Sequence, residues 1–291
     1  MLKTISLVVV AMFAFAANSL LCRMALAHTT IDPVTFTSIR IVSGAFALLF
    51  LSLLSKQRKP PGYHTESLWR DLKSNASVFG GLSLFFYAVC FSFAYISMST
   101  GTGALLLFGA VQLTMISIGL ISGERFKKRQ WCGFGFAFTG LIILLLPSAS
   151  APSLLSGAVM VIAGISWGVY SLLGKKSASA LLSTAGNFIY ASLLCIPLAL
   201  TVWLSSLEYL VLDKTGIYYA FASGILASGC GYAIWYSALP LIKSTTAATV
   251  QLSVPVLATV MGWAVLGEQL NLQILAASVA TLGGIYLVIK K

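Results

Sequence analysis

Long apolar runs alternate with short polar connections along this 291-residue chain. An α-helix crosses the hydrocarbon core of a bilayer with about 20 consecutive apolar residues, so each run of about that length predicts a transmembrane helix. Ten runs are present, at residues 4–22, 34–54, 75–97, 100–122, 130–147, 153–173, 184–205, 215–238, 244–266 and 271–289. The connection at 55–74 is long enough for a short surface helix around Trp69.

The second half of the chain repeats the first at a constant offset of 144 residues, the separation of Gly123 from Gly267. Residues 95–124 correspond to 239–268 without a gap, and the same register extends over some 60 residues. The most specific shared feature is a Gly-Glu pair at the end of an apolar run, found as Gly123-Glu124 and Gly267-Glu268. A fixed offset over this length indicates an internal duplication of half the protein.

The composition indicates that the chain lies in lipid. Hydrophobic residues make up 58% of it and charged residues only 9%, whereas soluble proteins are typically about 25% charged. The formal net charge is +11, but the basic residues lie in short groups between apolar runs and not on one face. Membrane lipid is therefore an expected partner, and nucleic acid is not.

The basic residues also predict that both termini are cytoplasmic, because positive charge is enriched on that side of membrane proteins. If the N-terminus is cytoplasmic and ten crossings alternate, 15 of the 18 Lys and Arg residues lie on the cytoplasmic side. They are Lys3, Lys56, Arg58, Lys59, Arg70, Lys73, Arg125, Lys127, Lys128, Arg129, Lys175, Lys176, Lys243, Lys290 and Lys291. Arg23 and Lys214 then lie outside, and Arg40 lies within the second run.

The first run has a second interpretation. Lys3, the apolar stretch and the segment 25–27 (Ala-Leu-Ala) resemble a secretory signal with its cleavage site. The apolar stretch is longer than usual for such a signal, and cleavage would destroy the symmetry of the two halves. We therefore expect the first run to be retained.

Each half holds five runs, an odd number, so the second half starts from the opposite side of the membrane. The predicted fold is an all-α membrane protein of ten transmembrane helices, built from two inverted five-helix repeats at residues 1–148 and 149–291. Inverted repeats place the substrate site near the bilayer midplane between the halves. Rocking of one half against the other then gives alternating access.

This pattern resembles the drug/metabolite transporter superfamily, and within it the EamA-type ten-helix transporters. The resemblance covers about residues 4–289. It depends on Pro33, Arg40, Gly123-Glu124-Arg125-Phe126, Gln130, Gly133, Trp167-Gly168 and Gly267-Glu268-Gln269-Leu270. The two copies are not equivalent, because Pro255 in the ninth run replaces Val111 of the fourth.

The resemblance implies a multi-pass protein of the bacterial cell inner membrane. Such proteins mostly export amino acids and other small metabolites, so the resemblance favours export over uptake. It also implies that the first, third, fourth, sixth, eighth and ninth helices surround a central cavity. The fifth and tenth helices are expected to pack at the sides.

Arg40 is a candidate substrate-binding residue. It lies roughly 9 Å inside the outer end of its helix, at 1.5 Å per residue, and a charge within the membrane is taken as functional by default. A guanidinium suits a substrate carboxylate, which it binds with two hydrogen bonds. The alternative is structural: the side chain extends outward to the interface or braces its helix against a carbonyl.

Three amide side chains lie within apolar runs and are further candidates for binding substrate. Gln112 is near the centre of the fourth run, Gln251 is about one turn from the centre of the ninth, and Asn18 is nearer the outside. Buried amides need hydrogen-bond partners. Either substrate groups or neighbouring helices can supply them.

Aromatic residues predict a cavity that favours apolar or aromatic metabolites. The candidates for its lining are Tyr87, Trp167, Tyr170 and Tyr232. For Trp235 and Tyr236 we expect instead a position in the aromatic belt at the membrane surface.

Glu124 and Glu268 begin the connections that follow the fourth and ninth runs. A carboxylate there can accept hydrogen bonds from the free N–H groups of the next helix, which is the role we expect. The alternative is a gate or a proton site. No Asp or Glu lies in the middle of a run, so a facilitator and coupling through one of these two residues both stay open.

Enzyme chemistry has little support in the sequence. The histidines, His28 and His64, lie in connections on opposite sides, and there is no Gly-rich phosphate loop, catalytic triad or metal cluster. The five cysteines fit neither a disulfide framework nor a zinc site. No cofactor or metal is expected.

The predicted function is therefore that of a secondary transporter and not an enzyme. It moves small metabolites, amino acids or related carboxylates, through a cavity between the repeats. Two alternatives stay open: a membrane-embedded lipid-modifying enzyme and a non-transporting accessory subunit. A homodimer is also left open.

Overall fold

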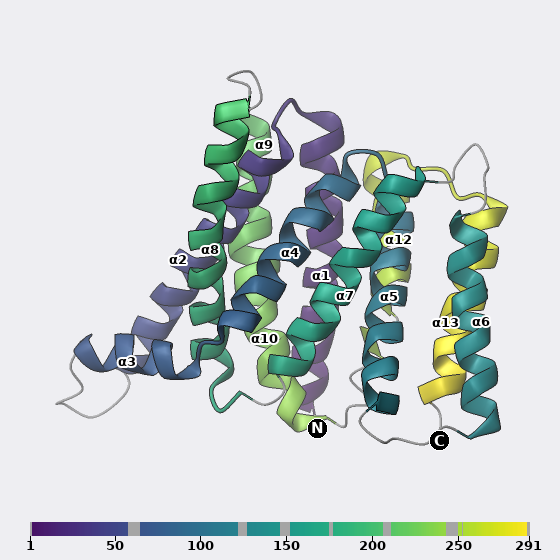
Figure 1. The fold of residues 1–291 in the computed structure, drawn as a ribbon, viewed down its shortest axis with the longest axis horizontal. Coiled ribbons are helices and arrows are strands. Elements are labelled where there is room, and N and C mark those ends of the chain that lie inside the picture. The colour runs from purple at the N-terminus through teal and green to yellow at the C-terminus, as the bar shows by residue number, and fades with distance from the viewer. Residues whose placement is uncertain are drawn as a thin grey trace.

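The computed structural model describes residues 2–57, 65–121, 127–145, 152–174, 177–205, 211–242, 250–251 and 253–289. Within these ranges every regular element is a helix, and the long helices form one bundle (Figure 1). The prediction of an all-α protein is confirmed.

The first half of the chain contains α1 (Leu2–His28), α2 (Pro33–Gln57), α3 (Thr65–Asn75), α4 (Val78–Tyr95), α5 (Thr100–Ile121) and α6 (Lys128–Leu145). The second half contains α7 (Leu154–Gly174), α8 (Ala180–Ser205), α9 (Lys214–Ala222), η1 (Ser223–Cys230), α10 (Gly231–Ala238), η2 (Leu239–Leu241), α12 (Ser253–Leu266) and α13 (Leu272–Ile289). These bounds agree with the predicted runs to within a few residues, with two exceptions: α1 extends further, to His28, and α12 begins at Ser253 although its predicted run begins at residue 244.

Seven spans among the described residues are long and apolar enough to cross a membrane, by length and composition: α1, α2, α4, α5, α7, α8 and the continuous span α9–η1–α10. They correspond to seven of the ten predicted runs. The other three runs contain α6, α12 and α13, and both α12 and the segment Leu272–Gly284 of α13 are shorter apolar helices. The labelled N and C ends lie at the same edge of the bundle (Figure 1).

Much of the outer surface of the bundle is apolar. Phe46, Phe79 and Leu154 are 68%, 73% and 77% exposed, and many other large apolar side chains are also turned outward. In water, exposed apolar surface carries a penalty of about 25 cal/mol per Å², and soluble monomers rarely carry extensive patches of it. Lipid removes this penalty, so the apolar surface supports the inference from composition that the chain lies in a membrane.

The predicted surface helix around Trp69 is present as α3, which lies across one end of the bundle (Figure 1). Leu68 and Leu72 are buried, whereas Trp69 is 63% exposed. α3 packs against α8. This amphipathic helix follows the segment 58–64, which lies outside the described residues.

Helices α6 and α13 pack against each other at one side of the bundle (Figure 1). The two helices lie so close together that Gly140 has no room for a Cβ atom against Thr281, and Gly284 has none against Ala137. Small residues allow helix backbones to approach in this way. The pair has the side position that the resemblance implies for the fifth and tenth helices.

The eighth run departs from a uniform α-helix. Its central part, η1, is a π-helix that joins α9 to α10. Gly224 of η1 has no room for a Cβ atom, because Ser43 and the carbonyl of Arg40 on α2 lie against it. The π-helical segment is therefore fitted closely to the helix that carries Arg40.

Candidate functional site

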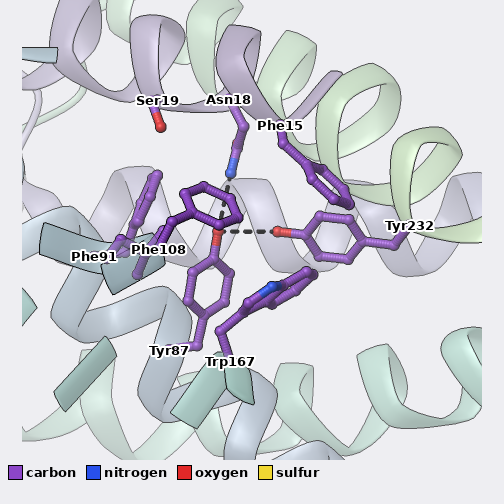
Figure 2. Close-up of a pocket in the computed structure, with 9 residues that line it drawn as sticks. Phe15, Asn18, Ser19, Tyr87, Phe91, Phe108, Trp167 and Tyr232 are labelled. Atoms are coloured by element: carbon purple, nitrogen blue, oxygen red, sulfur yellow. Dashed lines mark hydrogen bonds between the residues drawn. The ribbon is translucent and has the colours of Figure 1, made fainter. Parts of the chain in front are cut away.

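A small cavity of about 10 Å³ lies between α1, α4, α5, α7 and α10. Both halves of the chain contribute to it. Its lining consists of Phe15, Asn18, Ser19, Tyr87, Phe91, Leu107, Phe108, Trp167 and Tyr232 (Figure 2). Sites for small molecules usually measure about 300–1,000 Å³. A space of about 10 Å³ holds roughly one water molecule, so any small-molecule ligand requires the lining side chains to move apart.

Asn18 and Tyr87 are at the centre of a polar network in this mostly apolar cavity. The Asn18 amide donates a hydrogen bond to the Tyr87 hydroxyl at 3.2 Å, and the Tyr232 hydroxyl donates to the same oxygen at 3.1 Å (Figure 2). On its other side, Asn18 Oδ1 accepts from Ser223 Oγ at 2.6 Å and from Ser228 Oγ at 3.4 Å. The network joins α1 and α4 of the first half to η1 and α10 of the second.

The π-helix explains why both serines reach Asn18. Residues five positions apart on an α-helix point about 140° away from each other, since each residue turns the helix by about 100°. The wider turn of a π-helix, with its i→i+5 hydrogen bonds, brings such residues toward one face. Ser223 and Ser228 are five positions apart in η1 and share one acceptor.

Trp167 is surrounded by other aromatic rings. Its ring centroid lies 4.7 Å from that of Tyr232, 4.9 Å from Tyr87, 5.5 Å from Tyr170 and 5.7 Å from Phe15, in tilted or edge-to-face geometry. Such pairs contribute about 0.5–1.5 kcal/mol each beyond the burial of their area. The Trp167 indole is therefore held in one orientation. Its Nε1–H group is buried and has no acceptor among the described residues.

Arg40 lies beside this cavity and is 1% exposed. Its guanidinium carbon is 5.2, 5.7 and 5.9 Å from the ring centroids of Phe91, Tyr87 and Phe36. Both terminal nitrogens are buried without a hydrogen-bond partner among the described residues. The side chain therefore neither extends to the membrane surface nor braces a carbonyl through these nitrogens, as the structural alternative required.

The eight candidate residues differ in their position relative to the cavity. Asn18, Tyr87, Trp167 and Tyr232 line the cavity, and Arg40 contacts two of its rings. Tyr170 packs behind Trp167 and against Tyr236. Gln112 and Gln251 are each 1% exposed and do not belong to the described lining.

The prediction that Trp235 and Tyr236 lie in an interfacial belt is wrong. They are 0% and 2% exposed. Trp235 packs against Phe15 with ring centroids 5.8 Å apart, and Tyr236 donates a hydrogen bond to the Tyr170 carbonyl at 3.2 Å. Both side chains therefore pack inside the protein, because α10 turns this face toward α1 and α7.

Glu268 joins the two halves at one end of the bundle. Its carboxylate oxygens each accept from the Thr100 backbone N–H at 2.8 Å, one of them also accepts from Thr100 Oγ1 at 3.0 Å, and Arg23 Nε lies 3.7 Å away. Thr100 is the first residue of α5. The expected role of Glu268 as a helix cap is confirmed. The prediction that it caps the next helix in the chain is wrong, because it caps α5. The next helix, α13, uses Asn271, whose Oδ1 accepts from the Ile274 N–H at 2.8 Å.

Gly267 explains why a glycine precedes this glutamate. Its φ of +64° lies in the left-handed region, which glycine adopts without steric penalty and which commonly ends a helix. Gly262 has no room for a Cβ atom, because the Glu268 carboxylate lies against it. The glycines thus allow Glu268 to reach α5. The related pair Gly123-Glu124 lies outside the described residues.

Sequence reasoning missed several residues of the site. Phe15 and Phe108 line the cavity. Phe15 lies three positions before Asn18, and Phe108 four positions before Gln112, so helical spacing from these amides could have identified them. The contact of Ser223 with Asn18 depends on the π-helix, for which the hydrophobic pattern carries no signal.

The model of the EamA-like transporter family matches residues 2–146 and again residues 155–290, so two copies cover almost the whole chain. The chain belongs to the EamA-like transporter family. It is a multi-pass bacterial membrane protein, and family members are named as transporters and not as enzymes. The resemblance stated from the sequence is confirmed.

Several relatives match over most of their length. An uncharacterized protein of Pseudomonas aeruginosa is 46% identical over 99% of this chain and 94% of its own. An uncharacterized transporter of Archaeoglobus fulgidus is 25% identical over 99% and 98%. A protein of Salmonella typhimurium named as a probable amino-acid metabolite efflux pump is 28% identical over 71% and 74%. One crystal structure has a similar fold, with a TM-score of 0.64, 17% identity and 97% of each chain covered.

Proposed function

We propose that this EamA-like protein is a secondary transporter of the bacterial inner membrane that moves small metabolites bearing a carboxylate. Amino acids and related acids are the substrate class, and export is the favoured direction. The distant Salmonella relative named as an amino-acid metabolite efflux pump agrees with this class. Arg40 anchors the carboxylate.

The observation that supports this proposal best is the environment of Arg40. Burial of a cation that lacks a charged partner costs several kcal/mol, and contacts with aromatic faces return only about 0.5–2 kcal/mol each. A substrate carboxylate would supply both the charge and the in-plane acceptors that the guanidinium lacks. The rings of Tyr87 and Phe91 lie in contact with both Arg40 and the cavity.

We further propose ten transmembrane helices in two inverted repeats, residues 1–148 and 149–291, with both termini cytoplasmic. The cavity lies between helices of both proposed repeats, as the midplane site of an inverted-repeat carrier does. In this proposal, the contact of Glu268 with α5 and Arg23 is the closed outer gate. Alternating access then requires this contact to break when the cavity opens outward.

The experiment is substrate flux with the purified protein in proteoliposomes. We expect accumulation of radiolabelled carboxylates above that of protein-free liposomes, and a loss of at least about a hundredfold in Arg40→Gln, from removal of a buried charge-assisted pair. Arg70→Gln is the matched control, because Arg70 is exposed on α3. Equal flux in the folded Arg40→Gln variant would reject the anchor. Turnover of lipid without flux would favour the enzyme alternative, and flux only with a second protein would favour the accessory subunit.

A further inference from the structure

The cavity presents hydrogen-bond donors that have no acceptor. Trp167 Nε1–H is buried and unpaired among the described residues. The Tyr87 oxygen accepts from Asn18 and Tyr232, and the described residues give its own proton no acceptor. An indole donates only, and a phenol has one proton to donate. With the two free nitrogens of Arg40 beside them, these groups favour a ligand that accepts hydrogen bonds.

Among the described lining residues there is no carboxylate for a cationic ligand, and the unpaired side-chain acceptor is the buried Ser19 hydroxyl. Asn18 Oδ1 already accepts from Ser223 and Ser228. The seven acidic residues of the sequence all lie outside the apolar runs: Asp32, Glu66, Asp71, Glu124, Glu208, Asp213 and Glu268. An ammonium group donates three hydrogen bonds and accepts none. An amino acid bound here would therefore bury its ammonium group without a carboxylate.

Aromatic faces do not replace that carboxylate. A cation can bind over an aromatic ring within about 6 Å of its centroid, but Arg40 already lies over Tyr87 and Phe91. A second cation on these rings would be repelled by the guanidinium.

We propose that the cavity selects small aromatic monocarboxylates that carry no ammonium group over the corresponding amino acids. This inference rests on the proposed function and narrows its substrate class. The ring of the ligand lies among Phe15, Phe108 and Trp167, and its carboxylate accepts hydrogen bonds from Tyr87 and Trp167 near the charge of Arg40. The cavity measures about 10 Å³ in this conformation, so the ligand binds with displacement of the lining side chains.

Three compounds with the same ring and a chain of similar length test this selection: 3-phenylpropionate, phenylalanine and 2-phenylethylamine. Binding is measured as thermal stabilisation of the detergent-purified protein, and transport as flux into proteoliposomes against protein-free liposomes at the same pH. We expect 3-phenylpropionate to stabilise the protein at a concentration at least about tenfold lower than phenylalanine, as one uncompensated buried charge implies. The amine is expected to give no stabilisation.

A matched pair of tryptophans separates ligand contact from packing. Trp167 and Trp235 are both buried, both lack an acceptor for Nε1–H, and both contact Phe15 edge-on. Only Trp167 belongs to the cavity lining. Trp167→Phe should weaken binding of 3-phenylpropionate about tenfold, the effect of losing a hydrogen bond to a charged group. Trp235→Phe should change it by less than about twofold.

The outcomes distinguish this inference from the proposed function. Phenylalanine that binds and moves as well as 3-phenylpropionate overturns the selection and leaves the transporter intact. Selective binding of 3-phenylpropionate without flux of either acid supports the selection and rejects transport. Equal weakening by the two tryptophan substitutions, or no stabilisation by 3-phenylpropionate, overturns the inference.

Discussion

Arg23 and Arg40 belong to the same half of the protein but have opposite surroundings. Arg23 donates to the carbonyls of Tyr95 and Ile96 at 2.9 and 2.8 Å and lies 3.7 Å from Glu268. Arg40 contacts aromatic rings, and its terminal nitrogens have no partner among the described residues. Arg23 thus holds the ends of helices together, whereas the described residues leave the terminal nitrogens of Arg40 unpaired. The hydrogen-bond partners of an arginine within the membrane therefore indicate its role better than its depth does.

The largest expected effect comes from replacing each arginine by methionine. Arg23→Met removes two hydrogen bonds from a charged donor and the pairing with Glu268, so we expect a loss of roughly 2 kcal/mol. Arg40→Met removes a buried charge without a charged partner, a change that is often neutral or stabilising. Thermal unfolding of both variants in one detergent gives the comparison. A marked loss of stability in Arg40→Met would show that Arg40 also holds the fold.

A smaller effect is expected from Glu268→Gln. The amide keeps an acceptor for Thr100 but loses the negative charge at the start of α5 and beside Arg23, so stability should fall by about 1–2 kcal/mol. Asp213→Asn is the control, because Asp213 caps α9 through a hydrogen bond of 2.7 Å to the Gly216 N–H, and its contact with the first half is one long, exposed hydrogen bond from Thr30 at 3.4 Å. Asparagine is a good cap, so this variant should lose only a few tenths of a kcal/mol. Equal losses would indicate a local cap effect and not a link between halves.

The smallest effect is expected at Gly267. Gly267→Ala places a Cβ atom on a residue with a φ of +64°, which costs about 1 kcal/mol. The same substitution at Gly283 of α13 meets open space and no positive φ, so it should be neutral or slightly stabilising, as alanine is the better helix former. Unfolding of the two variants is compared under the same conditions. A neutral Gly267→Ala would contradict the backbone role of the Gly-Glu pair.

The helices and the duplication were predictable from the sequence, because both follow from regular spacing. Apolar runs identified the long helices, and the repeated Gly-Glu pair identified a shared design. The partner of Glu268 was not predictable in this way. Its carboxylate contacts Thr100, which is 168 residues away in the sequence, and only the packing of the two halves brings them together.

The candidate site was partly predictable for the same reason. A polar or aromatic residue in an apolar run stands out, so Asn18, Arg40 and Tyr87 could be identified. The sequence position of such a residue does not show whether its side chain points into the protein or toward lipid. Trp235 and Tyr236 illustrate this limit. Their residue types are typical of the membrane surface, but the orientation of α10 turns both side chains into the protein.

The π-helical segment Ser223–Cys230 has a consequence for everything that follows it in the eighth span. Tyr232 lies just beyond this segment, and its hydroxyl meets Tyr87 at 3.1 Å. Loss of one residue from the segment would rotate the downstream part of the span by about 100°. Tyr232 would then turn away from the cavity, although no side chain of the site had been altered. The rotation of α10 about its own axis, which the π-helical segment sets, therefore decides whether Tyr232 faces the cavity.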